Sequence, residues 1–151
     1  MTMSLEEISD RLEIQDLLVA YSYAIDSRDW AALDDVFTPD AHIDYTVFGG
    51  IAGTLPEIKK FLDDSMPMFS SFQHMIATSK VELNGDEATG KTICHNPMVI
   101  DKGNGETHVF YCGLWYVDKF VRTADGWRIK ERVEEKSYMH NVPTDFSVPE
   151  E

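Results

Sequence analysis

Asp26 and His74 are the two residues of this sequence whose side chains could together move a proton. A neutral imidazole is the natural base near neutral pH, and an adjacent buried carboxylate selects its tautomer and stabilises the imidazolium that forms. Asp26 falls in the last turn of a predicted helix, where the terminal carbonyls carry about half a negative charge and disfavour an anion. His74 opens a later predicted strand. We therefore predict an acid–base pair between these two elements.

Both residues also have structural interpretations that the sequence leaves open. Asp26 could be solvated beside Arg28, while Ser27 or Asp29 caps the next helix. A strand histidine such as His74 is, in many proteins, a satisfied or half-exposed residue. Contact between the two side chains is the observation that separates these interpretations.

Two tyrosines could assist such a base. Tyr21 lies on the apolar stripe of the first predicted helix, and Tyr45 lies in a short predicted strand. Their hydroxyls could hydrogen-bond a developing enolate oxygen, because oriented donors stabilise that charge without reorganising water. Alternatively, both are core aromatics whose hydroxyls reach water at the rim of a pocket.

His95 and Arg132 are secondary candidates for substrate binding. His95 lies just before Asn96 and Pro97 in a predicted central strand, where proline removes a backbone donor and indicates a bulge or an edge. Such an irregularity could aim His95 into a pocket. Arg132 has the opposite parity to the apolar Ile129 in its strand, so it either faces solvent or lines the other face of the sheet.

Composition limits the classes of partner. The chain has 151 residues, of which 43% are hydrophobic and 26% charged, which fits one globular domain with its own core. Thirteen basic against 27 acidic residues give a net charge of −14, and the basic residues do not cluster. A polyanion would be repelled, so we expect neither nucleic acid nor a membrane surface as partner.

We expect no metal and no organic cofactor. Cys94 and Cys112 are too few for a zinc site or a disulfide framework. The histidines do not occur at metal-ligand spacing, and the sequence contains no glycine-rich nucleotide loop. The N-terminal residues lack an apolar run of the signal-peptide kind, and no stretch approaches about 20 apolar residues, so a cytoplasmic protein is expected.

The first third of the chain predicts three helices. Ser4 and Glu7 form a capping box that begins the first helix, and apolar residues recur at helical spacing through Ile8, Leu12, Ile14, Leu18, Tyr21 and Ile25. A short helix over 30–37 should end before Pro39, since a residue preceding proline resists the helical conformation. A third helix should begin at Thr54 and end before Pro67. The alternation over 42–48 predicts a short strand between the last two.

The remainder predicts four long antiparallel strands, over 72–83, 89–101, 107–121 and 127–138, joined by turns such as Asn84-Gly85 and Asp125-Gly126. Strands of this length must twist and curve to remain compact. We therefore predict an α+β fold in which three N-terminal helices cover a cone-shaped, curved antiparallel sheet, with a pocket at its concave face. Residues 1–140 form the single domain, and residues 141–151 form an extended or mobile tail.

Four short segments resemble a known family. They are Ala-Ile-Asp-Ser-Arg-Asp-Trp at 24–30, Phe-Thr-Pro-Asp-Ala at 37–41, Gln-His at 73–74 and Asp-Gly-Trp-Arg-Ile at 125–129. Together they are similar to the SnoaL-like branch of the nuclear-transport-factor-2-like superfamily, over about residues 5–138. The resemblance implies the cone-shaped, cystatin-like roll. It does not imply one reaction, because this superfamily hosts dehydratases, isomerases, hydrolases, cyclases and non-catalytic subunits.

Within this superfamily the chain looks most like scytalone dehydratase and hexachlorocyclohexane dehydrochlorinase. The resemblance implies that His74 is the catalytic histidine and that Asp26 supports it. Tyr45 matches a tyrosine that polarises the substrate carbonyl through water in the dehydratase. Arg132 falls near an arginine that the dehydrochlorinase uses.

Three positions depart from those two enzymes. Ile25 replaces a tyrosine of the dehydratase, Cys112 replaces a polar amide of the dehydratase, and Tyr21 replaces a lysine of the dehydrochlorinase. The resemblance thus implies an elimination on a substrate that differs from both, and it makes Tyr21 and Cys112 candidates for binding that substrate.

We therefore expect a cofactor-independent lyase, of dehydratase or dehydrohalogenase type, that acts on a small hydrophobic cyclic molecule. One alternative is a ketosteroid-isomerase-like reaction in which Asp26 is the base and His74 a donor. Another is a non-catalytic module that binds a small ligand or stabilises a larger subunit. Exposed sheet residues, for which Tyr111, Trp115 and Phe120 are candidates, would support a homodimer or homotrimer.

Overall fold

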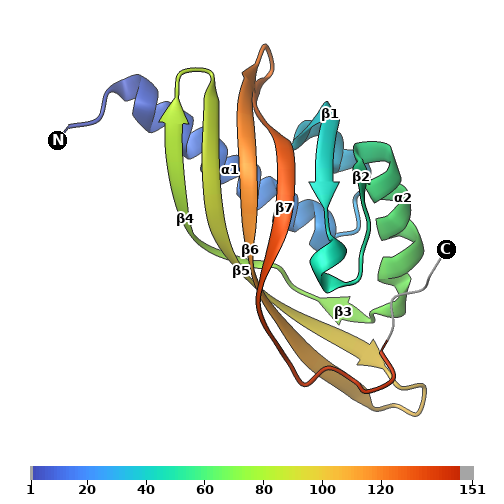
Figure 1. Ribbon diagram of the computed structural model, residues 1–151. Coiled ribbons are helices and arrows are strands. Elements are labelled where there is room, and N and C mark those ends of the chain that lie inside the picture. Colours follow the sequence, from blue (N-terminus) through green and yellow to red (C-terminus); the bar gives the residue numbers. More distant parts are fainter. Residues whose placement is uncertain (1, 147–151) are drawn as a thin grey trace.

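Helix α1 (Leu5–Asp26) begins where the sequence predicts. The structure is a computed structural model that describes residues 2–146 (Figure 1). The Glu7 backbone N–H donates to Ser4 Oγ at 3.1 Å, and the Ser4 N–H donates to the Glu7 carboxylate at 2.8 Å. This reciprocal capping satisfies two of the free N–H groups at the start of the helix, so the predicted capping box is confirmed.

The apolar stripe of α1 is buried only along its second half. Ile14, Leu18 and Ile25 are at most 2% exposed, whereas Leu12 is 56% exposed. Ile8, which we also predicted on the buried stripe, is exposed as well. The first turns of α1 extend past the edge of the sheet (Figure 1). Leu12 is exposed for another reason, since it lies on the side of the helix opposite the buried Asp10 and Ile14.

The second predicted helix is shorter than expected. It is a 3₁₀ turn, η1 (Ala31–Asp35). The carboxylate of Asp29 accepts a hydrogen bond from a free N–H at its start, because the Ala32 N–H donates to Asp29 Oδ1 at 3.1 Å. Strand β1 (Phe37–Asp44) then starts at Phe37, where we predicted helix, and it contains Pro39. The sheet tolerates this proline because the pairing of β1 is interrupted between Phe37 and His42.

The chain then returns to the helical layer. After the 3₁₀ turn η2 (Thr46–Phe48) and strand β2 (Ala52–Thr54), helix α2 (Leu55–Ser65) begins with Thr54 as its N-cap. Both the Thr54 N–H and its hydroxyl donate to the Glu57 carboxylate at 2.8 Å. A further 3₁₀ turn, η3 (Met66–Met68), includes Pro67, as the predicted end of this helix requires.

The four long strands form the predicted meander. They are β4 (Met75–Asn84), β5 (Glu87–Asp101), β6 (Thr107–Thr123) and β7 (Gly126–His140), and each pairs antiparallel with the next. Gly85 and Gly126 have positive φ angles of 63° and 104° in two of the connecting turns, which a side chain would strain.

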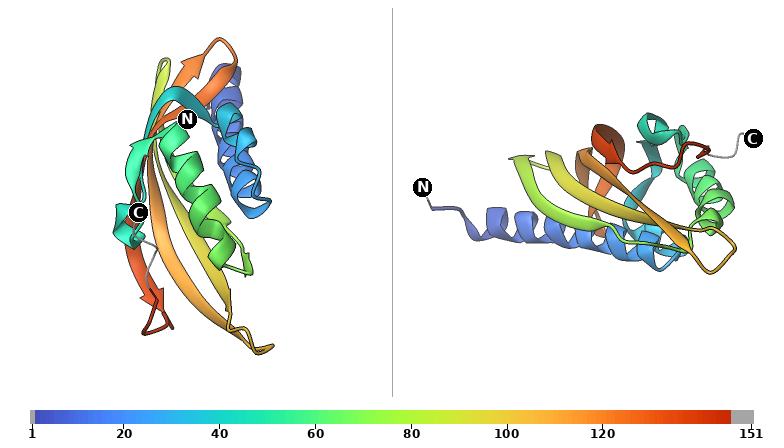
Figure 2. Two further views of the ribbon diagram at one scale, coloured as in Figure 1. Left: turned by 90° about the vertical axis from the view of Figure 1, so that its right-hand side faces the viewer. Right: turned by 90° about the horizontal axis from the view of Figure 1, so that it is seen from below.

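The complete sheet is mixed rather than purely antiparallel. Its order is β2-β1-β7-β6-β5-β3, with β4 also pairing with β5, and β3 is the short strand Ser71–Phe72. β1 runs parallel to β7, a pairing that the sequence analysis did not predict. The sheet is curved and unclosed, and Figure 2 shows that α1 and α2 both lie on one side of it, as predicted.

The inner face of β6 carries the largest side chains of the core. Phe110, Leu114, Tyr116 and Phe120 alternate along the strand and are at most 3% exposed. Phe120 was predicted on an outer surface with Tyr111 and Trp115, and that prediction is wrong for Phe120. The even-numbered residues of β6 face the helices, because side chains alternate across a strand.

Two irregularities reset the alternation in β7. One lies between Lys119 and Phe120 of β6, where Lys130 of β7 is left without an opposite residue; the other lies between Gly113 and Leu114. The first moves Arg132 to the same inner face as Ile129. The predicted opposite parity of Arg132 is therefore wrong, and this arginine is 0% exposed.

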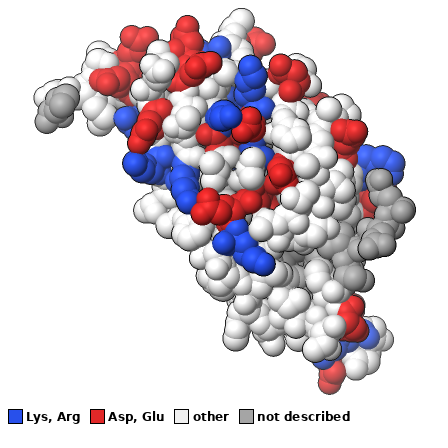
Figure 3. Space-filling model, viewed as in Figure 1, with Lys and Arg blue, Asp and Glu red and all other residues white. Residues whose placement is uncertain are grey.

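The outer face of the sheet is charged with both signs. Figure 3 shows basic and acidic side chains interspersed over this face. Cross-strand ion pairs join Lys91 to Glu135 at 2.8 Å and Lys119 to Glu131 at 3.0 Å. None of the helices in residues 2–146 has the length and hydrophobicity needed to cross a membrane.

Candidate active site

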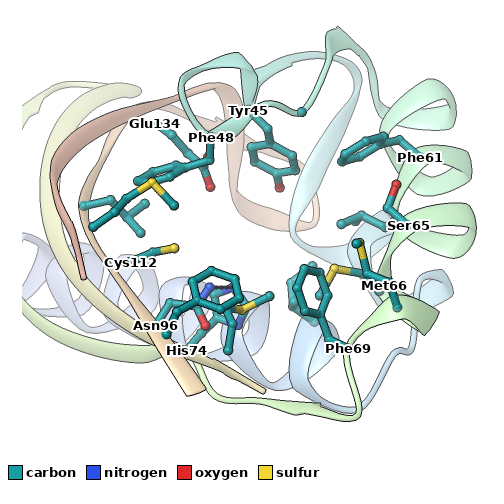
Figure 4. A pocket seen from close by; sticks show the side chains of 18 of the residues that line it. Tyr45, Phe48, Phe61, Ser65, Met66, Phe69, His74, Asn96, Cys112 and Glu134 are labelled. Carbon is teal, nitrogen blue, oxygen red and sulfur yellow. Dashed lines mark hydrogen bonds between the residues drawn. The ribbon is translucent and has the colours of Figure 1, made fainter. Parts of the chain in front are cut away.

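A largely apolar cavity lies between the concave face of the sheet and α2. Its walls come from α1, α2, the η2 and η3 turns and the inner faces of β5, β6 and β7 (Figure 4). Most of the lining side chains are aromatic or aliphatic. The polar groups in the lining belong to Tyr21, Tyr45, Ser65, His74, Asn96, Cys112 and Glu134.

His74 and Asp26 are in direct contact. Oδ1 of Asp26 lies 2.7 Å from Nδ1 of His74, and the His74 backbone N–H donates to both Asp26 oxygens at 3.1 and 3.0 Å. Asp26 is the last residue of α1, and His74 lies just before β4. The competing interpretation, in which Arg28 accompanies Asp26, does not hold: the Arg28 guanidinium donates to the carbonyls of Met66 and Phe69, both at 2.8 Å.

This contact fixes the role of each imidazole nitrogen. An ionised carboxylate only accepts hydrogen bonds, so Nδ1 of His74 carries the proton that Asp26 receives. The other nitrogen, Nε2, is then the acceptor of the neutral ring. The imidazole side chain is 8% exposed and lines the cavity, where Nε2 accepts a hydrogen bond from Asn96, so a ligand reaches Nε2 when that bond opens.

Asn96 is the second partner of His74, and the sequence analysis did not single it out. Its Nδ2 lies 3.2 Å from Nε2 of His74, while its Oδ1 is buried and has no partner within residues 2–146. A bound molecule with a hydroxyl or amine could satisfy that oxygen. Alternation along β5 could have predicted its inward position, because Asn96 lies on the same face of the strand as the apolar Cys94 and Met98.

His95, the neighbouring candidate, faces the opposite way. Its ring stacks on Tyr111 with centroids 5.6 Å apart, and its Nδ1 lies 2.8 Å from the Tyr138 hydroxyl. The pairing of β5 with β6 continues unbroken through Pro97, so there is no bulge to turn His95 inward. Pro97 instead lies where the other neighbour of β5 changes from β4 to β3, and its missing N–H is tolerated there.

Tyr45 and Tyr21 share a hydrogen bond at the cavity wall. Their hydroxyl oxygens are 2.6 Å apart, and both residues line the cavity. Burial raises the pKa of Tyr21 to about 12 and the pKa of Tyr45 well above its usual range. Both phenols therefore keep their protons near neutral pH and can act as donors.

Arg132 lies behind Tyr21 rather than in the cavity lining. Its guanidinium donates to both Asp118 oxygens at 2.7 and 2.8 Å and lies 4.1 Å from the ring centroid of Tyr21 and 4.0 Å from that of Tyr116. Burial alone would lower the pKa of Arg132, but Asp118 raises it above its usual range. The structure therefore separates Arg132 from the other sequence-predicted residues of the pocket.

Cys112 lies in the cavity lining, as we expected of a substrate-binding candidate. Burial raises the pKa of its thiol to about 12, so the sulfur remains neutral and behaves as a small apolar group. Within residues 2–146, no group of three or more His, Cys, Asp or Glu side chains is arranged to hold a metal ion.

Glu134 is another polar lining residue that the sequence analysis missed. It precedes Glu135, and two adjacent acidic residues usually indicate a solvated face. Burial raises the pKa of Glu134 to about 8; Arg132 opposes this increase and Asp44 adds to it. Only the irregularity at Lys130, which the sequence does not signal, brings Glu134 to the inner face.

The start of the predicted tail also reaches the cavity. Phe146 lines it and packs against Phe69 and Phe110, with ring centroids 6.1 and 5.2 Å away. A turn positions this ring, since the Phe146 N–H donates to the Pro143 carbonyl at 3.1 Å. Residues 147–151 of the predicted tail lie outside the described residues.

Comparison with known proteins identifies sequence relatives. The profile of the SnoaL-like domain matches residues 6–133. The Mycobacterium tuberculosis (strain H37Rv) protein Rv2910c is 52% identical over 136 residues, which cover 90% of this chain and 91% of the relative.

Solved structures share the fold. A putative scytalone dehydratase from Novosphingobium aromaticivorans has a TM-score of 0.81 at 17% identity, and the match covers 97% of each chain. Hexachlorocyclohexane dehydrochlorinase LinA-type3 from Novosphingobium barchaimii has a TM-score of 0.77 at 21% identity, over 97% of this chain and 99% of that one. At these identities, the similarity establishes a common architecture.

Proposed function

The chain belongs to the SnoaL-like family, and from that premise we propose that it is a cofactor-independent lyase acting on a small hydrophobic cyclic substrate. The observation that carries the proposal is the 2.7 Å contact between His74 Nδ1 and Asp26 Oδ1 at the wall of an apolar cavity. Two structural neighbours are named as a dehydratase and a dehydrochlorinase, and both names describe eliminations.

In the proposed reaction, Nε2 of His74 removes a proton from a carbon next to a carbonyl group. The C–H electron pair forms the new double bond as the leaving group departs from the adjacent carbon. Asp26 stabilises the imidazolium, and a positioned base of this kind contributes about 10²–10⁴-fold to the rate. The side chains present suffice for each of these steps, so the scheme uses no cofactor.

Tyr45 is suited to hold the substrate carbonyl. Its hydroxyl points into the cavity in Figure 4, and its pKa is raised, so it donates to an oxygen that gains negative charge. Tyr21 orients it through the 2.6 Å hydrogen bond. The cation of Arg132, stacked on the far face of Tyr21, favours negative charge in the same region.

The geometry favours His74 over Asp26 as the base. Asp26 is not part of the cavity lining, and His74 occupies both of its oxygens. A ketosteroid-isomerase-like reaction with Asp26 as base would require that contact to open. A purely ligand-binding role would keep the cavity but make catalysis independent of His74.

The test compares His74→Ala with His95→Ala. We expect His74→Ala to lower elimination from a panel of cyclic hydroxy ketones and halides by about 10²–10⁴-fold. His95→Ala removes the same side chain from the outer face and should retain the wild-type rate. Equal rates in the two variants would contradict the proposal, and ligand binding without turnover in the wild type would support the binding module instead.

A further inference from the structure

Glu134 occupies a position that the reaction proposed above does not use. It lies two residues after Arg132 on the inner face of β7, directly opposite Tyr116 of β6. Figure 4 shows its carboxyl group pointing into the cavity from the same side as Tyr45, whereas His74 and Asn96 lie on the opposite side. The cavity therefore has titratable groups on two facing walls.

Unlike the other inward-facing acids near the cavity, Glu134 has no donor. Asp26 binds His74 and Asp118 binds Arg132, but within residues 2–146 no hydrogen bond or ion pair reaches the Glu134 carboxyl. An unpaired carboxylate is costly in a largely apolar cavity, and the group avoids this cost by keeping its proton.

The charges around Glu134 do not reverse this preference. On β7, Arg132 favours the carboxylate, and on β1, Asp44 opposes it. The other neighbours, from α1, β5, β6 and the residue before η2, are phenols and thiols that stay neutral near neutral pH because burial raises the pKa of each: Tyr21, Tyr45, Tyr116, Cys94 and Cys112. The pKa of Glu134 is accordingly raised to about 8, above the neutral range.

We infer that Glu134 is the catalytic acid that protonates a departing hydroxyl group, and that the substrate class is therefore β-hydroxy carbonyl compounds rather than halides. This inference rests on the proposed function, because it requires His74 to be the base. It adds to that function the source of the proton that the leaving oxygen takes.

The step balances with two residues. Nε2 of His74 takes the proton from the carbon next to the carbonyl, and the C–H electron pair becomes the carbon–carbon double bond. The carbon–oxygen bond breaks with its electrons on oxygen, and this oxygen takes the proton of the Glu134 carboxyl and leaves as water. The products are the enone, water, an imidazolium and a carboxylate, and the two residues exchange protons with solvent to reset.

The departure of a halide does not require the proton of Glu134. Chloride departs as a stable anion and needs no proton, whereas hydroxide is a poor leaving group unless it is protonated. A neutral carboxyl beside the leaving group therefore selects hydroxyl over halide.

The first test uses two substrates that yield the same product. 3-Hydroxycyclohexanone and 3-chlorocyclohexanone both give cyclohexenone, and its ultraviolet absorbance measures each elimination above the uncatalysed rate. We expect Glu134→Gln to slow the hydroxy ketone by about 10²–10⁴-fold and the chloro ketone far less. Glutamine keeps the size and a hydrogen-bond donor but has no proton to transfer.

The control is Glu135→Gln, the same change one residue along β7 on the outer face, where it should leave both rates at the wild-type level. If Glu134→Gln slows both substrates equally, Glu134 is not the acid for the leaving group. If His74→Ala has no effect on either substrate, the proposed function fails.

A second test needs no substrate. Infrared difference spectra between the wild type and Glu134→Gln at pH 7 should show the carbonyl band of a carboxylic acid, and this band should convert to carboxylate bands near pH 8. Carboxylate bands already present at pH 7 would overturn the inference even if the proposed elimination holds. A wild type that converts neither ketone would overturn the proposed function and, with it, the assigned substrate class.

Discussion

Two pairs of a carboxylate and a basic side chain contact Tyr21, and they differ in whether the basic side chain reaches the cavity. Arg132 and Asp118 are both 0% exposed, and two tyrosine rings cover the guanidinium at 4.1 and 4.0 Å. His74 and Asp26 are 8% and 27% exposed, and the imidazole also touches the edge of the Tyr21 ring, with centroids 6.4 Å apart. One pair is closed, whereas the other opens onto the cavity.

A structural ion pair differs from a candidate catalytic pair in the nitrogen atoms of the basic side chain that do not contact the carboxylate. Nη1 of Arg132 has no hydrogen-bond partner within residues 2–146, but it is buried, and neither Arg132 nor Asp118 lines the cavity, so a ligand there does not reach this pair. Nε2 of His74 faces the cavity beside Asn96. Each pair has one carboxylate whose two oxygens are both held by the partner, and the pairs differ in their access to the cavity.

Breaking the closed pair of Arg132 and Asp118 should lower the free energy of unfolding the most. Asp118→Asn leaves the Arg132 charge buried without a counter-ion, and the loss of such a partner costs about 3–5 kcal/mol of unfolding free energy. Urea denaturation at neutral pH measures it.

The matched control replaces both members, as in Asp118→Leu with Arg132→Met, and should recover most of the loss because no buried charge remains. A single variant that loses less than about 1 kcal/mol would show that water reaches the pair, and the contrast with the open pair would then fail.

Breaking the open pair should change activity more than stability. In Asp26→Asn, the amide oxygen can still accept the His74 backbone N–H, so we expect a loss of about 1 kcal/mol in unfolding free energy. The imidazolium loses its counter-charge, and the proposed elimination should slow by about 10²–10⁴-fold. Denaturation and initial-rate measurements on one preparation check both values. A variant that is unstable yet fully active would reverse the roles of the two pairs.

Replacing the unpaired Glu134 should change the free energy of unfolding in the opposite direction. Because its folded-state pKa is raised to about 8, the native protein holds a proton that the unfolded chain releases near pH 4.3. The contribution of Glu134 to stability is therefore fully present below about pH 4.3 and is lost as pH rises toward 8. Each pH unit between the two pKa values corresponds to about 1.4 kcal/mol, so Glu134→Gln should be more stable than the wild type by a few kcal/mol at pH 8, with little difference at pH 4. A gain that is independent of pH would contradict this linkage.

The sequence predicts the residues that local rules determine. The capping box of α1, the long meander and the proximity of Asp26 and His74 follow from periodicity, turn residues and helix-end electrostatics. Asn96 was within reach of the same reasoning, because simple alternation along β5 places it on the inner face.

The sequence could not predict features that depend on pairing between distant strands. The parallel contact of β1 with β7 joins segments far apart in the chain, and the irregularity opposite Lys119 arises from register with β6. Strict alternation therefore assigned the wrong face to Arg132, and it would turn Glu134 outward as well. The inward position of Phe146 also depends on tertiary contacts, with Phe69 and Phe110.

The extra residue at Lys130 has an evolutionary consequence. Lys130 and Glu131 together occupy one step of the alternation, so deleting the Lys130 codon would place Ile129 and Arg132 two positions apart and leave Arg132 and Glu134 on the inner face. The buried cation behind Tyr21 and the acid on the cavity wall would both stay in place. Within one lineage, the strand can thus gain or lose this residue without changing the side chains that face the cavity.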